Sequence, residues 1–571
     1  MDRHKLLGIF ILCMFVLLVF GLFNLNIIEG RKYKKLSNSN CIRLIPQFGC
    51  RGNILDRQGE LIVGNKISYD VMILPQDISD LDRVLGAVAR VLAVDQQQLR
   101  KAFKSGYISS SVPVTIASNI DVKKAIALGE YKVNEPSVII QPKPLRYYPY
   151  STLAAHLIGY LNEIDRWRLT KLEDYGYKTK DIVGFGGVEE KYDYYLRQEE
   201  GGLSVEVNHQ GKFTRVLGFE LPKNGQEIQL TIDLIAQKAA ETALDGRKGC
   251  IVIMDPNNGE IIALASYPNF DPAVFVKRQN PRIAELFNNR NAPLINRATS
   301  ASYPPASVFK VIVATAALEL KKVNSSTSFL CPGFLWVGKR KFSCWDTHGN
   351  QNLTQAIAHS CDTFFYHTGL SVGAQNIYNY ALKLGMVKPA NFELGYEVNG
   401  FIPSPLWRKL NRFQGWYDGD TANLSIGQGE CLVTPMQIAN MMAVFANGGY
   451  LCTPYVVKSI GGFDVSNHKR RLINVRLKKN TLEKIRQGLR EVVTDEKGTA
   501  NALNGISVTV AGKTGTAQVS RGQTHAWFAG FFPFDKPKYV ICVFLENGGP
   551  GHAACVVAKQ VIESMASQGL K

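Results

Sequence analysis

A long apolar run lies close to the N-terminus of the chain. Residues Leu6–Phe23 are eighteen apolar or small side chains without a charge, and Leu25, Ile27 and Ile28 follow. A run of this length can cross a membrane once as a helix. A signal peptide has a shorter apolar region that ends in small residues at a cleavage site. We therefore interpret residues 6–28 as an uncleaved transmembrane anchor and residues 1–5 as a cytoplasmic tail.

Positive charges flank this anchor on both sides. Two basic residues precede it and four follow it closely: Arg3, Lys5, Arg31, Lys32, Lys34 and Lys35. The simple count of flanking charges would place the rest of the chain in the cytoplasm, but long domains cross membranes largely regardless of charge. The orientation therefore has to be argued from the chemistry of the chain.

Residues 29–225 have mixed patterns and carry no metal or nucleotide signature. Short alternating runs such as Tyr69–Leu74 favour strands, whereas Leu81–Leu92 has the spacing of an amphipathic helix. The segment Arg51–Gly59 has the glycines and charges of a hairpin tip. We predict a non-catalytic, elongated pedestal for residues 29–225.

From residue 226 the pattern changes to an alternation of strands and helices. A helix is predicted through Ala236–Leu244, and the apolar runs Cys250–Met254 and Ile261–Ala265 are separated by turn residues, which indicates a hairpin. After a helical middle, strands are predicted at the alternating Ile506, Val508 and Val510, at Trp527–Phe532 and at Tyr539–Leu545, and a last helix begins near Ala553. Strands at both ends with helices between them predict an α+β fold in which distant strands share one sheet.

Composition and charge narrow the classes of function. The 571 residues are 46% hydrophobic and 20% charged, which is typical of two or three folded domains, and the net charge is +18. Such a charge favours an anionic partner, which is nucleic acid, a lipid headgroup surface or an anionic wall precursor. No basic repeat or recognition motif supports nucleic acid. We therefore predict no nucleic-acid partner.

The first candidate for chemistry is the serine–lysine pair Ser307 and Lys310. Two prolines precede it, and the apolar stretch Val311–Leu318 continues as a predicted buried helix. Residues three apart on a helix share a face, so the Lys310 amine would lie beside the Ser307 hydroxyl. A buried lysine without a proton can act as the general base for a serine nucleophile. Ser466 and Lys469 have the same spacing, but they lie in a polar turn.

Two further motifs follow in the chain. Ser360-Cys361-Asp362 precedes an aromatic helix face, and its hydroxyl could relay a proton. Lys513-Thr514-Gly515-Thr516 closes the predicted strand from Ile506, where a glycine permits close approach of a substrate and the other side chains can hold a carboxylate. Each motif alone is more often a helix serine, a helix cap or a strand end. The three in this order, each in its expected local structure, favour a serine acyl-transfer site.

The three motifs resemble the S-x-x-K, S-x-N and K-T-G set of the penicillin-recognising enzymes. Further segments extend the resemblance, over nearly the whole chain, to class B penicillin-binding proteins of the elongation type: Arg51–Gly59, residues 146–160, Pro293–Ala298, Gly427-Gln428-Gly429 and Thr434-Pro435. Two positions depart from the family pattern, because Ala306 replaces a usual glycine and Asp362 replaces a usual asparagine. Neither departure removes a catalytic group.

The resemblance implies a fold, an activity and partners. The fold is the penicillin-binding transpeptidase fold, an antiparallel sheet with helices on both faces, over residues 226–571. The activity is crosslinking of peptidoglycan stem peptides derived from lipid II, during cell elongation, with the catalytic domain in the periplasm of a bacterial inner membrane. The implied partners are the membrane, a SEDS-type, RodA-like glycosyltransferase and an MreC-like elongation scaffold.

The same resemblance assigns roles to single residues. Ser307 would attack the D-Ala-D-Ala carbonyl with Lys310 as base, and Ser360 would relay protons. The terminal carboxylate would bind Lys513, Thr514, Gly515 and Thr516, while Asp362 would hold the acyl-chain amide. β-Lactams would acylate Ser307, because they present a strained amide to the same groups.

Two alternatives use the same motifs. A β-lactamase of class A would need a deacylating glutamate in an E-x-x-L-N motif, and the chain has none. A sensor that is acylated without turnover would usually carry more membrane spans or a signalling segment, and neither is visible. Both alternatives are less consistent with the chain than the transpeptidase.

Cysteines near the second motif raise a separate hypothesis. Cys331, Cys344, His348 and Cys361 offer three thiolates and one imidazole, a set suited to tetrahedral zinc. Their spacing is looser than that of a zinc finger. The alternatives are a Cys331–Cys344 disulfide with Cys361 as a buried thiol, or Asp346 as a substitute ligand. No cofactor is expected for the acyl transfer itself, so a zinc ion would be structural.

Overall fold

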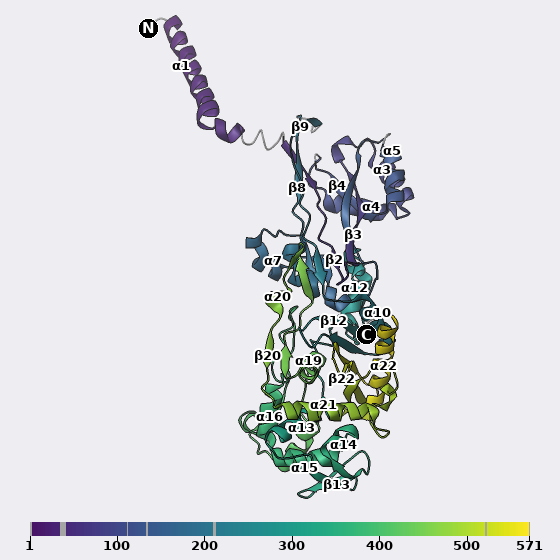
Figure 1. Ribbon diagram of the computed structural model, residues 1–571. Coiled ribbons are helices and arrows are strands. Elements are labelled where there is room, and N and C mark those ends of the chain that lie inside the picture. Colours follow the sequence, from purple (N-terminus) through teal and green to yellow (C-terminus); the bar gives the residue numbers. More distant parts are fainter. Residues whose placement is uncertain are drawn as a thin grey trace. The chain divides into compact units, whose positions relative to one another are not determined.

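The computed structural model describes residues 3–34, 42–110, 112–132, 135–208, 213–519 and 522–569. Met1 and Asp2 of the predicted tail and Lys35 beyond the anchor lie outside these ranges. Helix α1 (Arg3–Phe23) continues as a π-helix over Asn24–Ile28, and its side chains are exposed. Residues Arg3–Ile28 form the one helix, in the described part of the chain, that is long and apolar enough to cross a membrane (Figure 1).

Contacts divide the chain into two compact units. The N-terminal unit comprises residues 1–52, 65–145 and 197–225, and the C-terminal unit comprises residues 53–64, 146–196 and 226–571. The last crossing between the units falls at the boundary predicted for the catalytic domain. Residues 53–64 and 146–196, however, belong to the same compact unit as the predicted catalytic domain and not to the unit that holds the rest of the predicted pedestal.

The N-terminal unit contains an antiparallel sheet and a small mixed α and β layer. Its three-stranded sheet has the order β1 (Ile42–Gln47), β8 (Gly201–Val207), β9 (Phe213–Glu220). Helix α3 (Leu81–Leu92) begins where Asp80 accepts hydrogen bonds from the backbone N–H groups of Asp82 and Arg83. The remaining elements of this layer are β3 (Leu61–Ile73), α4 (Gln96–Gly106), β4 (Val114–Ile120), α5 (Val122–Lys132) and β5 (Val138–Tyr147).

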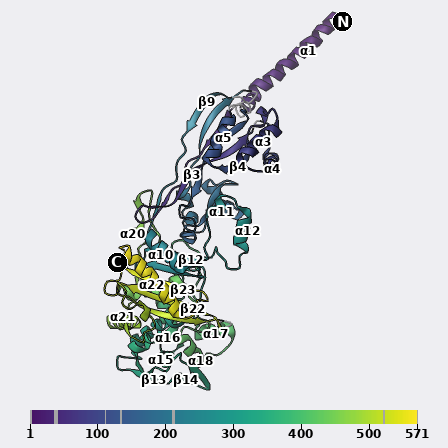
Figure 2. The ribbon, with the colours of Figure 1, turned by 90° about the vertical axis from the view of Figure 1, so that its right-hand side faces the viewer.

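The core of the C-terminal unit is a five-stranded antiparallel sheet whose strands come from both ends of this part of the chain. The order is β12 (Ile261–Tyr267), β11 (Gly249–Met254), β23 (Tyr539–Leu545), β22 (Thr524–Phe532), β21 (Ala511–Gln518). Helices α10 (Leu234–Leu244) and α22 (Gly551–Ser567) cover one face (Figure 2), and α19 (Pro435–Ala446) packs on the other. The predicted α+β fold with helices on both faces is confirmed.

One predicted strand was placed wrongly. Residues Ile506–Val510, which alternate in polarity, are not a strand, and β21 begins at Ala511. The motif Lys513–Thr516 therefore lies inside β21 and does not close it. The small and polar residues of β21 show no strand pattern, because pairing of each backbone residue with β22 holds this strand in the sheet.

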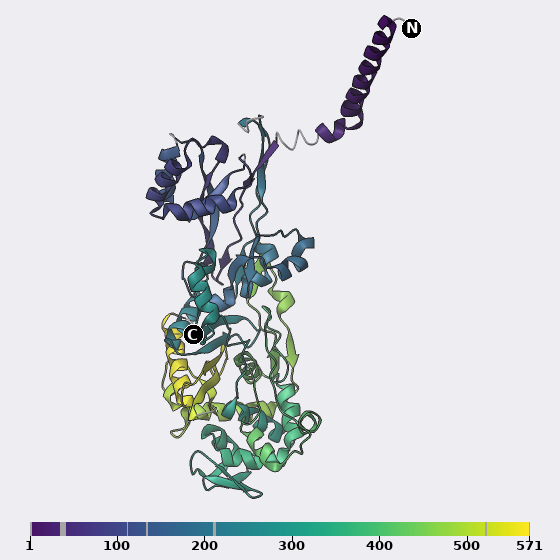
Figure 3. The same ribbon diagram turned by 180° about the vertical axis from the view of Figure 1, so that it is seen from behind.

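Most of the elements between β12 and β21 are helices, in the part of the chain that is teal to green in Figure 3. Those next to the three motifs are α13 (Lys310–Glu319), α14 (Leu353–Ala358), α15 (Asp362–Val372) and α21 (Lys479–Thr494). The other helices are α6 (Ala155–Ile158), α7 (Arg166–Leu172), α8 (Gly187–Lys191), α9 (Asp193–Leu196), α11 (Ala273–Val276), α12 (Asn280–Asn288), α16 (Ala374–Lys383), α17 (Pro405–Arg412), α18 (Asp418–Ser425) and α20 (Ser466–Lys469).

Short strands complete this unit. Parallel and antiparallel pairs join five strands in the order β19 (Phe463–Asp464), β18 (Val457–Ile460), β10 (Ile228–Leu230), β2 (Ile54–Leu55), β3. Strands β2 and β3 form the hairpin that was predicted at Arg51–Gly59. Four antiparallel pairs are β6 (Tyr160–Glu163) with β7 (Ile182–Phe185), β13 (Ser328–Cys331) with β16 (Gly349–Asn352), β14 (Phe334–Val337) with β15 (Arg340–Ser343), and β17 (Tyr450–Cys452) with β20 (Leu472–Asn474).

Candidate active site

The candidate nucleophile, Ser307, lies on a short 3-10 turn, Ala306–Phe309, that leads into α13. Ser307 is partly exposed, whereas its neighbours Ala306 and Val308 are buried. Ala306 has a φ of 49°, a left-handed conformation that favours glycine. Ala306, which replaces the glycine usual in the family, thus lies at a position where the backbone adopts a left-handed conformation.

The backbone of the Gly427 loop holds this turn in place. The Ala306 N–H donates to the Gly427 carbonyl at 3.0 Å. A side chain at Gly427 would bring its Cβ within 2.3 Å of the Ala306 carbonyl oxygen, and the φ of Gly427 is +68°. The glycine loop therefore fits directly against the residue that precedes the nucleophile.

Lys310 brings the first two motifs together. Its side chain is fully buried, and Nζ donates to the Ser360 carbonyl at 2.8 Å and to Ser360 Oγ at 3.2 Å. Nζ also contacts Asp362 Oδ1 at 2.6 Å. Ser360 has a φ of 55°, which directs both its carbonyl and its hydroxyl to the lysine from the turn between α14 and α15.

The third motif lies on β21, which is the edge strand of the central sheet. Lys513 is fully buried there, and burial together with the nearby charge of Lys310 holds its pKa well below the usual value, an effect that Asp362 partly offsets. At Gly515 an added Cβ would lie 3.2 Å from Val308 Cγ2 and 3.3 Å from the Pro305 carbonyl oxygen. The glycine thus allows β21 to lie against the turn that carries Ser307.

Two hydroxyl groups of this strand have partners that the sequence did not reveal. The Thr514 hydroxyl contacts the Thr499 hydroxyl, with 2.7 Å between the oxygens. Thr516 Oγ1 accepts a hydrogen bond of 2.9 Å from the Gly551 N–H, in the first turn of α22. Thr499 belongs to none of the three motifs and Gly551 follows a proline, so no local pattern indicated either contact.

The structure therefore gathers the predicted catalytic residues and leaves an open strand edge beside them. A buried lysine, a second hydroxyl and a partly exposed serine provide a nucleophile with groups that move protons. An edge strand has free backbone groups for an extended peptide. Such an arrangement suits acyl transfer from a peptide-like substrate.

The four predicted metal ligands also meet in one place. The Sγ atoms of Cys331, Cys344 and Cys361 and a ring nitrogen of His348 lie within 4.8 Å of one another. His348 Nδ1 is 3.6 Å from Cys331 Sγ and 3.5 Å from Cys344 Sγ. Tetrahedral zinc would separate sulfur and nitrogen ligands by roughly 3.5 Å, as follows from bond lengths of about 2.3 and 2.0 Å. The donor set and its spacing therefore fit zinc.

The surroundings of this cluster reach the second motif. The Asp362 N–H donates to Cys344 Sγ at 3.2 Å, and Cys361 caps α15 by accepting from the Phe364 N–H at 3.5 Å. The Cys361 thiol, and to a smaller extent His348, lowers the pKa of the Cys344 thiol. Cys331 and Cys344 are both free thiols, so the alternative disulfide is not formed. The Asp346 carboxylate accepts from the Thr347 N–H and is not part of the cluster.

Comparison with known proteins places this site in a family. Residues 249–565 match the penicillin binding protein transpeptidase domain, and residues 46–230 match the penicillin-binding protein dimerisation domain. The chain is 32% identical to the peptidoglycan D,D-transpeptidase MrdA of Acinetobacter baumannii, over 97% of this chain and 86% of that protein. Both matches agree with the order of the two predicted regions along the chain.

Solved structures give the same result. The penicillin-binding protein PBP2 of Helicobacter pylori, in a complex with MreC, is 29% identical and superposes with a TM-score of 0.82 over 93% of this chain and 99% of that chain. A chain from a peptidoglycan synthase complex that coordinates polymerization and crosslinking is 29% identical, with a TM-score of 0.76 over 99% of this chain and 98% of that chain. Because the transpeptidase domain spans more than half of the chain and relatives align along nearly all of it, the chain belongs to the penicillin-binding proteins and is a peptidoglycan D,D-transpeptidase of the MrdA type.

Proposed function

We propose that Ser307 forms the acyl-enzyme of the transpeptidation. Its hydroxyl attacks the carbonyl between the two terminal D-alanines of a stem peptide, and Lys310 accepts the proton. Ser360, 3.2 Å from Lys310 Nζ, passes a proton to the amine of the departing D-alanine. An amine from a second stem peptide then attacks the ester, and Ser307 recovers its proton. The contact of Lys310 with Ser360 is the observation that carries this proposal.

The substrate would lie along β21. Lys513, Thr514 and Thr516 would receive the terminal carboxylate, and the backbone N–H groups of Ser307 and Thr516 would stabilise the oxyanion. One donor of an oxyanion hole is worth roughly 10²–10³ in turnover. β-Lactams would use the same groups and acylate Ser307.

Labelling with a fluorescent penicillin tests the nucleophile. Ser307→Ala should abolish covalent labelling, because the acylated oxygen is removed. Ser466→Ala is the matched control, since Ser466 has the same spacing to a lysine but is buried on the short helix α20, and it should label normally. Labelling that persists in Ser307→Ala, or disappears in Ser466→Ala, contradicts the proposal.

A structural zinc ion at Cys331, Cys344, His348 and Cys361 is a second proposal. The spacing of the four ligand atoms supports it, and no protein disulfide competes for these thiols in the described part of the chain. When bound, zinc would neutralise the thiolates and tie the β13–β16 hairpin region to α15. The Cys361 and Asp362 backbone would then be held close to Lys310, so the ion would stabilise the second motif without taking part in acyl transfer.

Metal analysis of the purified protein tests this second proposal. One zinc atom per chain should copurify, and Cys344→Ser should lose the metal and lower both the melting temperature and the rate of penicillin acylation. Cys431→Ser is the control, because Cys431 is a buried thiol outside the cluster. A metal-free preparation with full acylation activity would falsify the proposal.

The N-terminal unit is proposed to dock an MreC-like scaffold and a SEDS-type polymerase at the membrane surface. Two relatives support this, because one was solved with MreC and the other within a peptidoglycan synthase complex. The basic charge of the chain suits anionic headgroups and the pyrophosphate of lipid II. The chemistry of these substrates supports a periplasmic catalytic unit.

A deletion within the N-terminal unit tests docking without unfolding the catalytic unit. Residues 53–64 have to stay, since the Asp56 carboxylate accepts from the Leu234 N–H at 3.3 Å and Gln58 donates to Asp233 at 2.7 Å. Strands β3 and β5 pair with each other, so residues 66–144 can be replaced by a short glycine–serine linker. The deletion should keep penicillin labelling and lose binding to the scaffold. Unchanged scaffold binding would contradict the docking role.

A further inference from the structure

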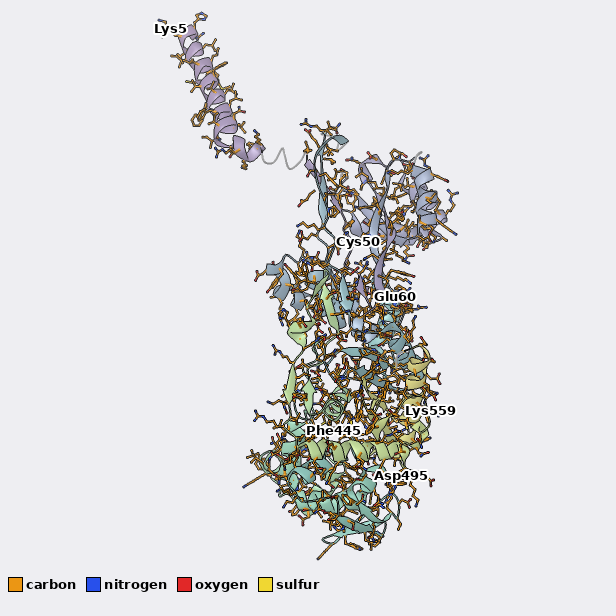
Figure 4. All side chains as sticks on the ribbon, in the orientation of Figure 1. Lys5, Cys50, Glu60, Phe445, Asp495 and Lys559 are labelled. Atoms are coloured by element: carbon orange, nitrogen blue, oxygen red, sulfur yellow. The ribbon has the colours of Figure 1, made fainter. Side chains whose placement is uncertain are left out.

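The segment that follows α21 contacts the third motif and the residues just before the second motif. Asp495, marked in Figure 4, ends the helix, and Thr499 lies four residues later. The Thr499 N–H donates to the Ala358 carbonyl at 3.3 Å, two residues before Ser360, and the hydroxyls of Thr499 and Thr514 are 2.7 Å apart. A single residue outside the motifs thus joins the backbone just before the second motif to a hydroxyl of the third.

The backbone holds Thr499 in this place closely. The Ala500 N–H donates to the Val492 carbonyl at 2.9 Å, and Ala500 is fully buried. At Gly498 an added Cβ would lie 2.4 Å from the Val492 carbonyl oxygen and 2.9 Å from those of Asp495 and Glu491. Only glycine fits there, because the chain folds back onto the last turn of α21. Thr499 is therefore fixed at the end of a tight turn.

The two threonines that would receive the substrate carboxylate, Thr514 and Thr516, each have to donate a hydroxyl hydrogen to it, because a carboxylate only accepts hydrogen bonds. A hydroxyl has one hydrogen to donate and two lone pairs to accept with. At Thr516 the Gly551 N–H occupies a lone pair, which leaves the hydrogen free for the carboxylate. At Thr514 the neighbouring group is another hydroxyl, that of Thr499, and here Thr514 is the donor.

We infer that Thr499 is a positioning residue for carboxylate recognition by Thr514. When a carboxylate arrives, Thr514 turns its hydrogen to the carboxylate, and Thr499 turns its own hydrogen to Thr514 Oγ1. Thr514 Oγ1 then accepts a hydrogen bond from Thr499 while it donates one to the carboxylate, and the chain of two hydrogen bonds strengthens the bond to the charged group. This inference rests on the proposed role of Thr514 in holding the carboxylate.

Isosteric variants and a neutral ligand separate this role from a packing role. Thr499→Val keeps the shape of the side chain and removes the hydroxyl, whereas Thr499→Ser keeps the hydroxyl. Acylation by benzylpenicillin should slow about three- to tenfold in Thr499→Val, the effect of losing one hydrogen bond between two hydroxyl groups, and Thr499→Ser should recover most of the rate. Acylation by the methyl ester of benzylpenicillin, which has no carboxylate, should be equal in wild type and Thr499→Val.

Several outcomes would overturn the inference. An equal loss for the acid and the ester would show that Thr499 only supports packing, as would a Thr499→Ser variant as slow as Thr499→Val. Thr514→Val serves as the reference. If Thr514→Val slows acylation by benzylpenicillin but not by its methyl ester, while Thr499→Val reacts with both at the wild-type rate, Thr499 has no role in carboxylate recognition. If Thr514→Val loses the acid and the ester equally, the proposed carboxylate role of Thr514 is itself wrong. Ser307→Ala independently tests the acyl-enzyme.

Discussion

The turn that carries Ser307 depends on a glycine more than a hundred residues away in the chain. Gly427→Ala would place a methyl group 2.3 Å from the Ala306 carbonyl oxygen and 2.6 Å from Phe309 Cβ, so the turn has to move. A shift of about 1 Å at a reacting group can cost roughly 10² in rate. We therefore expect Gly427→Ala to slow penicillin acylation by about that factor, measured by stopped-flow or gel labelling.

A second glycine of the same loop isolates the cause. Gly429 also has a left-handed φ, +86°, but the nearest atom to an added Cβ is 3.9 Å away. Gly429→Ala should thus share the backbone strain and lack the collision. Equal effects of the two substitutions would mean that strain in the loop, and not the collision with Ala306, governs the position of Ser307.

Asp362 supports Lys310 in a way that the motif alone did not indicate. The sequence suggested that its carboxylate holds the substrate amide, and this role stays a prediction, whereas the structure shows Oδ1 2.6 Å from Lys310 Nζ. Asp362→Asn keeps an oxygen that can accept from the lysine, but Asp362→Ala leaves a buried amine short of one partner. Acylation should fall at least tenfold further in the alanine variant. Equal losses in both would show that the accepting oxygen is unimportant.

Among single residues, the sequence allowed us to predict those that lie in recognisable local patterns. Ser307 and Lys310 are one helical turn apart, and Lys513–Thr516 are consecutive, so spacing alone indicated them. Thr499 was missed because its significance comes from a contact across fifteen residues to β21 and from a backbone turn that only the folded chain reveals.

Elements were predicted well where their side chains alternate or repeat. Strand β23 and helix α3 have the predicted bounds, because apolar faces on each meet a core. Strand β21 was misplaced because its residues are small and polar, and long-range pairing with β22 decides its conformation. Strand β21, the edge strand beside the active site, could therefore not be predicted from its own pattern of apolar and polar residues.

A half-buried histidine in α6 predicts how the C-terminal unit responds to acid. His156 Nε2 lies 2.7 Å from the Pro293 carbonyl oxygen, and its ring meets the edge of Phe270. Burial lowers the pKa of His156 to about 4, with a smaller lowering by Arg297 and an opposing effect of the Pro293 bond. The unfolded chain, with a pKa of about 6.5, binds the proton first as pH falls.

The stabilising effect of neutral His156 is therefore complete above about pH 6.5 and lost as pH falls to about 4, a change of about 3 kcal/mol. His156→Asn cannot titrate and keeps a donor for Pro293. Its melting temperature should fall less than that of wild type between pH 7 and 4.5, whereas the exposed control His468→Asn should follow wild type. Parallel pH curves for wild type and His156→Asn would show that another group causes the acid sensitivity.

For the whole molecule, the family and fold followed from the sequence, but the grouping of segments did not. Residues 53–64 and 146–196 look like parts of a continuous N-terminal domain, yet they pack with the catalytic unit through contacts such as Arg57 N–H to the Ile232 carbonyl, 2.9 Å. A boundary drawn along the chain cannot represent two units that exchange segments. The contacts that decide this grouping join residues nearly two hundred positions apart.

The orientation in the membrane is the prediction on which charge and chemistry disagree. Arg3 and Lys5 precede the anchor, while Arg31, Lys32, Lys34 and Lys35 follow it, so the count alone favours a cytoplasmic catalytic unit. Crosslinking of stem peptides takes place outside the inner membrane, and long domains cross it largely irrespective of such charges. We therefore expect the chain beyond the anchor to be periplasmic. Protease added to intact spheroplasts should digest it and spare a tag at the N-terminus.

Cys50, which is exposed in the N-terminal unit, gives a second measurement (Figure 4). A maleimide that cannot cross membranes should label it in intact spheroplasts, and the part of the signal lost in Cys50→Ser reports this site alone. A cytoplasmic control protein should stay unlabelled until lysis, which shows that the membrane is closed. Protection of the chain from protease, together with Cys50-dependent labelling only after lysis, would reverse the orientation and put the catalytic serine on the side where no crosslinked wall exists.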